Sequence, residues 1–296
     1  MTDIQPRYPI FIPTLSRADS RMTIKALQRM GIKEWYAIVQ PEEYTQYAAV
    51  IDKQHILVLP HIYKESYETL DTLGLTKSTG PGPARNFAWD TAVQMGHDWH
   101  WVIDDNILQF TRWNNNLRFE VQSGAYFRLM EDFCSRYENV GMAGPNYRAF
   151  LPRKYKRPPF LLNTRIYSCN LIRNDVPYRW RGRYNEDTIL SLDMLKDKWC
   201  TVQFNAYQQD KMATQTVRGG NDKVFYSIEG THPKSLMLVN EYPEYARLVE
   251  KYGRPHHFVD YTQFKHPLKR KQGISIEYND YGMKLETVSE RATHPR

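Results

Sequence analysis

The chain has 296 residues, enough for one large or two small domains, and its 41% hydrophobic and 25% charged residues are typical of a globular protein. Its apolar runs are all shorter than the roughly 18 residues of a membrane-spanning helix, and its first residues lack the pattern of a signal peptide. The net charge of +7 is modest, and three scattered cysteines offer neither disulfide nor zinc spacing. We therefore expect a cytoplasmic protein that has no membrane attachment.

The first predicted strand is the apolar run 8–15, and the spacing of residues 21–30 predicts a helix after it. Thr14, Ser16 and Arg17 fall where this strand passes into the helix. In doubly wound sheets the base or the phosphates of a nucleotide bind at such a junction, so all three are candidate nucleotide ligands. For Ser16, a role as a helix cap is an equally good interpretation.

Strands are next predicted at 35–40 and 55–60, with a helix opening at Pro41 between them. Strands that alternate with helices indicate an α/β fold with a mostly parallel sheet.

Another helix is predicted from Pro83, with Arg85 and Asn86 in its first turn. A cation is unfavourable at the positive end of a helix dipole. Arg85 therefore needs an anionic partner, such as a phosphate or the acidic residues that follow the next strand.

That next strand, residues 100–103, runs directly into Asp104, Asp105 and Asn106. Adjacent carboxylates repel one another unless a cation or hydrogen-bond donors hold them. Oxygen ligands of this kind suit Mg²⁺ or Mn²⁺ together with a substrate's phosphates. The alternative is a simple turn, which the same three residue types also favour.

Positive charge is concentrated between residues 148 and 183, where ten basic residues accompany a single acidic one and aromatic residues lie among them. Cations interleaved with aromatic rings suit a polyanion whose bases stack. The alternative is a solubilising surface. From this stretch we predict the DNA-binding residues Arg153, Lys154, Lys156, Arg157, Arg181, Arg183 and Trp180.

Further strands are predicted at 117–119, 140–144, 166–173 and 201–207, and further helices at 123–137 and from Asn185 to Leu195. The last helix begins with Glu186 and Asp187. Acids at a helix start often only compensate its dipole. The functional interpretation is a general base, which must be ionised and within hydrogen-bond reach of a hydroxyl. Which of the two carboxylates acts remains open at this point.

The segment around His232-Pro233-Lys234 offers an imidazole for a metal and an ammonium for a phosphate. A solvated turn is the competing interpretation. His256 and His257 are a second, less favoured pair of candidate metal ligands, and the segment from Gln272 is expected to be a peripheral strand and tail.

Taken together, four motifs resemble those of glycosyltransferases with the GT-A fold. They are Ile-Pro-Thr-Leu-Ser-Arg at the first strand, Pro-Ala-Arg-Asn-Phe-Ala on a helix, the Asp-Asp-Asn cluster and Asn185-Glu186-Asp187. The cluster is similar to the Asp-x-Asp motif of that fold, with Asn106 in its third position. His232 to Ser235 resembles the C-terminal histidine element that closes the metal and diphosphate site. The combination resembles the phage glycosyltransferases associated with TET/JBP dioxygenases, which are relatives of the enzyme that makes base J.

The resemblance covers about residues 8–238 and implies an inverting hexosyltransferase. Its donor would be a UDP-sugar and its acceptor the hydroxyl of a 5-hydroxymethylpyrimidine, such as 5-hydroxymethylcytosine, in DNA. Mn²⁺ or Mg²⁺ would bind Asp105, with Asn106 and His232 assisting, because a neutral amide is a weaker ligand than a carboxylate. Thr14, Ser16, Arg17, Arg85, Asn86, Asp104 and Lys234 would hold the donor, and Asp187 or Glu186 would be the base.

We also expect a monomer in the cytoplasm of the host cell if the chain is phage-encoded. Its GT-A domain would span 1–240, and a C-terminal extension over 241–296 would pack on that domain. Three alternatives remain. They are a glycosyltransferase for carbohydrate or protein acceptors, a nucleotidyltransferase, which would need a glycine-rich phosphate loop after the first strand, and a non-catalytic DNA-binding protein. The sequence does not identify the sugar.

Overall fold

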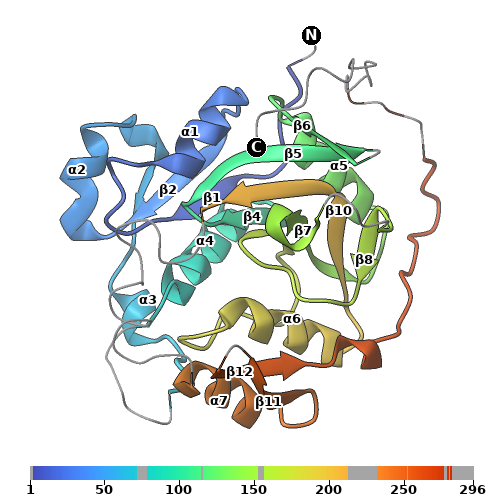
Figure 1. The fold of residues 1–296 in the computed structure, drawn as a ribbon. Helices are drawn as coiled ribbons and strands as arrows, with labels where there is room; N and C mark the ends of the chain where they lie inside the picture. Colours follow the sequence, from blue (N-terminus) through green and yellow to red (C-terminus); the bar gives the residue numbers. More distant parts are fainter. Residues whose placement is uncertain are drawn as a thin grey trace.

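The computed structural model describes residues 3–71, 79–114, 116–152, 157–212, 232–251 and 253–276, together with 279 and 281. These residues form a twisted central sheet with helices packed against it and a smaller layer below (Figure 1). No described helix combines the length and the apolar character needed to cross a bilayer.

The first part of the chain alternates strands and helices, as the sequence predicts. Its four strands lie side by side in the order β3-β2-β1-β4 and are parallel. The elements are β1 (Ile10–Pro13), α1 (Met22–Arg29), β2 (Trp35–Val39), η1 (Pro41–Glu43), α2 (Tyr44–Ala48), η2 (Lys53–His55), β3 (Ile56–Val58), α3 (Ile62–Glu65), α4 (Gly82–Gln94) and β4 (Trp99–Ile103).

The second part completes the sheet and then adds a layer of its own. Its elements are β5 (Ile107–Asn114), β6 (Leu117–Glu120), α5 (Ala125–Cys134), β7 (Val140–Tyr147), η3 (Arg148–Phe150), β8 (Phe160–Leu162), β9 (Cys169–Arg173), α6 (Glu186–Lys196), β10 (Cys200–Lys211), α7 (His232–Glu241), β11 (Ala246–Lys251), β12 (Arg254–Val259) and η5 (Tyr261–Gln263).

The described strands form a ten-stranded sheet in the order β3-β2-β1-β4-β9-β7-β10-β5-β6, with β8 paired to β10. Only β5, β8 and β9 run against the common direction. The expected α/β fold with a mostly parallel sheet is therefore confirmed. Because β9 is antiparallel, its beginning lies at the same edge of the sheet as the ends of β4, β7 and β10.

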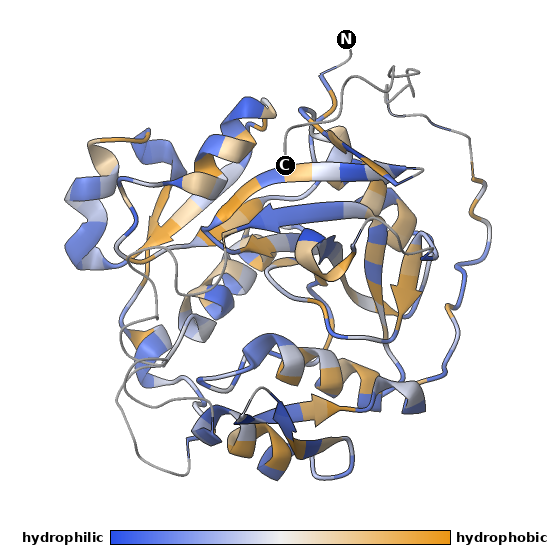
Figure 2. Cartoon of the chain, in the orientation of Figure 1, coloured by the Kyte–Doolittle hydropathy of each residue, from blue (hydrophilic) through white to orange (hydrophobic). Residues whose placement is uncertain are grey.

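The core explains this arrangement. All five residues of β4 are buried, as expected of a central strand covered on both faces. On one face Trp101 packs edge-on against Phe127 of α5, with ring centroids 5.0 Å apart. On the other face Val102 packs with Ala84 and Ala88 of α4. Figure 2 shows β2 largely in the hydrophobic colours, the arrow of β10 in the hydrophilic ones, and the helices with both.

Helix α6 lies between the sheet and a layer formed by α7 and the β11–β12 hairpin (Figure 1). Ile189 and Leu192 of α6 pack against Leu238 and Ala246 of this layer. The chain then returns along α5, where the backbone N–H of Glu138 donates to the carbonyl of Lys269 at 2.8 Å. The proposed division at 240/241 stays a prediction.

Several elements were not predicted from the sequence, among them α3, β5, β8, α7, β11 and β12. Strands β5 and β8 have short or irregular apolar patterns, and α7 begins at the segment that was also interpreted as a turn. Asn185 occupies the N-cap position of α6 but has φ 53° and forms no side-chain cap. Its amide instead donates to the carbonyl oxygen of Lys234 at 2.8 Å and so joins the start of α6 to α7.

Candidate active site

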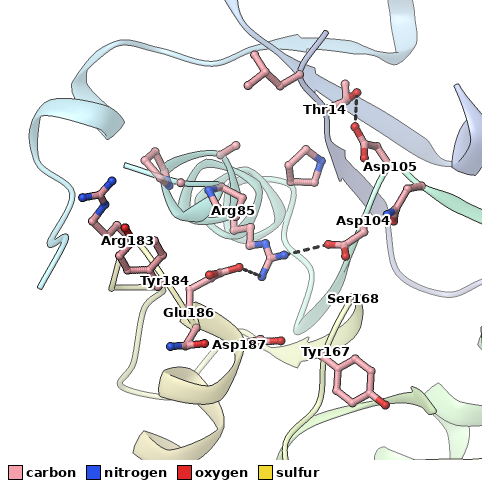
Figure 3. Close-up of a pocket in the computed structure, with 18 of the residues that line it drawn as sticks. Thr14, Arg85, Asp104, Asp105, Tyr167, Ser168, Arg183, Tyr184, Glu186 and Asp187 are labelled. Atoms are coloured by element: carbon pink, nitrogen blue, oxygen red, sulfur yellow. Dashed lines mark hydrogen bonds and ion pairs between the residues drawn. The ribbon is translucent and has the colours of Figure 1, made fainter. Parts of the chain in front are cut away.

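A cavity of about 410 Å³ opens at the edge of the sheet where the parallel strands end. The ends of β1, β4 and β10 and the beginning of β9 form one side of it, and the beginnings of α4 and α6 form the other. This is the edge at which open α/β sheets bind their ligands. Figure 3 shows carboxylates entering the cavity from both sides, with Arg85 between them.

The two carboxylates after β4 have hydrogen-bond or ion-pair partners on all four oxygens. Asp105 accepts from Thr14 Oγ1 at 2.9 Å through Oδ2 and pairs with the Arg17 guanidinium through Oδ1. Asp104 pairs with Arg85 at 3.0 Å and with Lys211 Nζ at 3.4 Å. Burial alone would raise the pKa of Asp104, but Lys211 and Arg85 outweigh it and hold that pKa below its usual value.

Arg85 connects the two sides of the cavity. One guanidinium nitrogen contacts Asp104, and another lies 3.2 Å from Glu186 Oε1 at the start of α6. Its guanidinium also lies over the Trp180 ring, 4.6 Å from the centroid, and the residue is 5% exposed. These contacts confirm the prediction that Arg85 needs an anionic partner.

The two acids of α6 differ in their surroundings. Burial raises the pKa of Glu186, and the nearby Arg85 only partly offsets this effect. Asp187 is half-buried, and both of its hydrogen bonds within the described chain go to Oδ1, from the backbone N–H and the hydroxyl of Thr188. Asp187 is therefore better placed than Glu186 to accept a proton, because its second oxygen, Oδ2, is available while Glu186 is engaged with Arg85.

The described lining of the cavity carries more positive than negative charge. Seven cations face four carboxylates, so a ligand with two or more negative charges would balance the site. One of the cations, Arg183, has a fully buried side chain and pairs with Asp71 at 2.8 Å. The cations are Arg17, Lys64, Arg85, Arg165, Arg183, Lys211 and Lys234, and the carboxylates are Asp104, Asp105, Glu186 and Asp187.

The oxygens at the end of β4 suit a divalent cation bound together with phosphates. The Asn106 Oδ1 atom is buried and has no hydrogen-bond partner among the described residues, next to the carboxylate of Asp105. No cluster of three His, Cys, Asp or Glu that would hold a metal occurs in the described part of the chain. Mg²⁺ sites commonly use one or two carboxylates and take their remaining ligands from water and substrate.

Other predicted ligands lie elsewhere. His232 is exposed at the first position of α7 and does not line the cavity, which contradicts its predicted place beside Asp105. Ser16 neither caps α1 nor enters the cavity, because its N–H and hydroxyl both donate to Glu43 Oε1. Asn86 points away from the site and exchanges two 2.9 Å hydrogen bonds with the backbone of Trp180.

The predicted DNA-binding residues have different surroundings. Trp180 is 1% exposed beneath Arg85, which contradicts a stacking role on DNA. Arg181 has both Asp193 and Glu241 as partners and serves to join α6 to α7, and Arg183 lines the cavity with a buried side chain that pairs with Asp71. Arg157 is exposed and remains a predicted DNA contact. Arg153, Lys154 and Lys156 lie outside the described residues.

Sequence reasoning missed three polar residues of the site. Lys211 ends β10 and also donates to Ser168 Oγ at 2.6 Å, and Arg165 stacks 4.6 Å from the Tyr167 ring centroid. The useful signal was present: a lysine ends the long strand β10, and an arginine lies four residues before β9. Assigning these two residues to the site requires the directions of β9 and β10, which the sequence does not supply.

Comparison with known proteins now identifies the family. A sequence model of the family described as TET-Associated Glycosyltransferase matches residues 8–220, more than half of the chain. The chain belongs to this family. As a TET-associated glycosyltransferase it is a transferase enzyme, and the mixed α/β sheet agrees with the expected GT-A-like fold. No curated protein matches the sequence significantly.

For this TET-associated glycosyltransferase the matched region includes β4 with the acidic cluster, Arg85 and both acids of α6. It ends before α7 and the β11–β12 hairpin. The ends of the strands that line the cavity and the two acids of α6 therefore lie within the family region, whereas Lys234 and the layer below α6 lie outside it.

Proposed function

We propose that this enzyme transfers a sugar from a UDP-sugar to the hydroxyl of a 5-hydroxymethylpyrimidine in DNA, with inversion at the anomeric carbon. The observation that carries the proposal is the Arg85 bridge, which brings Asp104 and Asp105 into one cationic cavity with Glu186 and Asp187. A transferase needs a site for an anionic leaving group and a base close to it, and the bridge connects the two.

The donor's diphosphate is the ligand that best matches the excess positive charge. Arg17 and Lys211 pair with the carboxylates at the end of β4, and Lys234 of α7 also lines the cavity. Phosphates bound among these three cations would take the place of the carboxylates as their partners. Thr14, at the end of β1, is placed to help position the nucleotide. Arg85 is held too firmly by its two carboxylates to follow the ligand, and its role is to fix the geometry.

In the proposed reaction Asp187 accepts the proton of the acceptor hydroxyl. The hydroxyl oxygen then forms a bond to the anomeric carbon as the bond from that carbon to the diphosphate oxygen breaks. The bonding electrons leave with UDP, and attack opposite the leaving group inverts the configuration. Glu186 acts through Arg85, as a positioning residue.

Asp105 and Asn106 would hold a divalent ion, with the donor's phosphate oxygens as further ligands. When bound, the ion would offset negative charge on the leaving diphosphate. The surrounding cations share that task, because they remain beside the phosphates throughout the reaction.

The test is incubation of the enzyme with DNA containing 5-hydroxymethylcytosine, 5-hydroxymethyluracil or neither, with several UDP-sugars, and with Mn²⁺ or EDTA. Nucleoside mass spectrometry should detect a hexosylated nucleoside only with hydroxymethylated DNA and metal. Transfer to oligosaccharide or protein controls, with none to DNA, would instead support the alternative acceptor class.

A further inference from the structure

A second cavity, of about 310 Å³, lies directly beside the first. The two share Phe150, Arg165 and Tyr167 in their linings. The second cavity is also lined by residues of β7, α6 and β10, and by His257, Phe258 and Tyr261 of β12 and η5, which belong to the layer below α6. None of these three residues has a role in the donor site proposed above.

Aromatic rings form much of this second cavity. Phe150 is 57% exposed and Phe258 is 36% exposed, and both line this one cavity. The Phe150 ring lies 5.7 Å from that of Tyr167, and the Arg247 guanidinium lies 4.7 Å from the Phe258 ring centroid. A cation therefore stands beside the aromatic wall, where the backbone of a nucleic acid bound in the cavity would pass.

Two polar atoms in the lining have no hydrogen-bond partner among the residues that the structure describes. His257 Nδ1 and the Tyr261 hydroxyl are both buried and make no hydrogen bond within the part of the chain that the structure describes. Buried polar atoms are normally satisfied, so each is a candidate contact for a ligand.

Both groups are neutral. Burial, with Lys234 and Arg165 nearby, lowers the pKa of His257 to about 4, and burial raises the pKa of Tyr261 above its usual value. At neutral pH they therefore offer an uncharged imidazole nitrogen and a hydroxyl. These suit the edge of an uncharged heterocycle better than they suit a phosphate.

The second cavity also adjoins the proposed base. Thr188 lines it, while Asp187, the preceding residue on α6, lines the first. The charge of Asp187 acts on both His257 and Tyr261. A group projecting from a ring in the second cavity would therefore point across Arg165 and Tyr167 toward Asp187.

We propose that this cavity, the acceptor-base cavity, receives the target pyrimidine extruded from DNA, stacked on Phe258 and Phe150, with its polar edge toward His257 and Tyr261. This inference rests on the proposed function and names the acceptor side of the same site. Enzymes that modify a base commonly take it out of the stack and read its edge within a pocket.

The experiment compares Phe258→Ala with Tyr44→Ala, a matched control because both rings are 36% exposed and Tyr44 lies on α2 away from both cavities. Transfer to hydroxymethylated duplex DNA and binding of UDP-sugar without DNA are both measured. Phe258→Ala should raise the KM for DNA by about tenfold to a hundredfold through loss of stacking. The donor Kd should stay within about twofold, and Tyr44→Ala should change neither.

Tyr261→Phe removes only the hydroxyl and keeps the ring. It should alter the ratio of kcat/KM between 5-hydroxymethylcytosine and 5-hydroxymethyluracil by roughly threefold to tenfold, as expected for one hydrogen bond. Wild-type enzyme should also act faster on a mispaired target base, because extrusion is then easier.

The outcomes separate the two proposals. If the wild type transfers sugar to DNA but Phe258→Ala and Tyr261→Phe behave like Tyr44→Ala, the acceptor-base cavity is wrong and the proposed function stands. A weaker donor Kd in both variants would place the donor's own base there and also overturn the inference. If the wild type transfers nothing to hydroxymethylated DNA, both proposals fail.

Discussion

The two adjoining cavities are built on opposite principles. Around the end of β4 every carboxylate oxygen of Asp104 and Asp105 already has a donor, and cations outnumber acids in the lining. In the acceptor-base cavity the rings are partly exposed, and His257 Nδ1 and the Tyr261 hydroxyl lack partners among the described residues. One cavity is rich in paired charge, and the other contains unpaired neutral groups.

The difference follows from the cost of burial. An unpaired buried charge costs several kcal/mol, so a site for a charged ligand must hold internal counter-ions until that ligand arrives. An unpaired neutral group costs about 1–3 kcal/mol and is tolerated. The paired cavity therefore suits a ligand that exchanges ionic partners, and the unpaired one suits a ligand that supplies missing hydrogen bonds.

The largest expected effect comes from replacing Asp187, the proposed base, which lies where the two cavities adjoin. Asp187→Asn should lower kcat by about 100- to 10,000-fold, because the amide no longer accepts a proton. The donor Kd should stay nearly unchanged, as measured by calorimetry with UDP-sugar. An equal loss of transfer and donor binding would mean that Asp187 holds the donor and is not the base.

The paired cavity itself is tested through Arg85. Arg85→Leu leaves Asp104 and Glu186 buried without their shared partner, and stability should fall by about 3–5 kcal/mol in urea unfolding. Adding Glu186→Gln should restore part of that loss, since one stranded charge is removed. Purely additive losses would mean that the bridge is not a coupled unit.

A smaller effect is expected at the metal ligands. Asn106→Asp adds a negative charge beside Asp105 and should tighten Mn²⁺ binding by about tenfold, measured by electron paramagnetic resonance titration. His232→Ala, at the exposed first position of α7, should leave Mn²⁺ affinity unchanged and serves as the control. Weaker binding in Asn106→Asp would remove the metal from this position.

The smallest effect concerns DNA affinity and salt. Arg247→Ala, at the rim of the acceptor-base cavity, should reduce the slope of log K against log salt by about 0.9, the contribution of one phosphate contact. Arg181→Ala should lower stability and leave that slope unchanged, because its charge is already paired with Asp193 and Glu241. Equal slopes for Arg247→Ala and wild type would leave the rim without a role in DNA binding.

Much of the donor side was predictable because its signals are local. Strand β4 running into Asp104-Asp105-Asn106 and the acids that open α6 each follow from a short stretch of sequence. Arg85 was predictable for a physical reason, since a cation in the first turn of a helix needs an anion. The parallel direction of the first four strands also followed from their alternation with helices.

The basic stretch 148–183 shows where such reasoning stops. Its sequence contains a high density of charge, but the direction of each side chain depends on tertiary structure. Arg148 pairs with Asp210, Arg173 with Asp175 and Arg181 with Asp193, so much of the charge is neutralised internally. Trp180, expected to meet DNA, packs beneath Arg85 instead. Likewise Lys211 reaches Asp104 only because β10 runs parallel to β7, which no local pattern reveals.

Among the described strands, β11 and β12 pair with each other in a separate two-stranded sheet. This hairpin nevertheless contributes His257 and Phe258 to the acceptor-base cavity, while the donor cavity draws on other elements apart from the shared wall. Residues 246–259 are therefore the smallest natural segment to exchange when engineering the enzyme toward a different nucleobase. A graft of this kind would change what is modified and leave the choice of sugar intact.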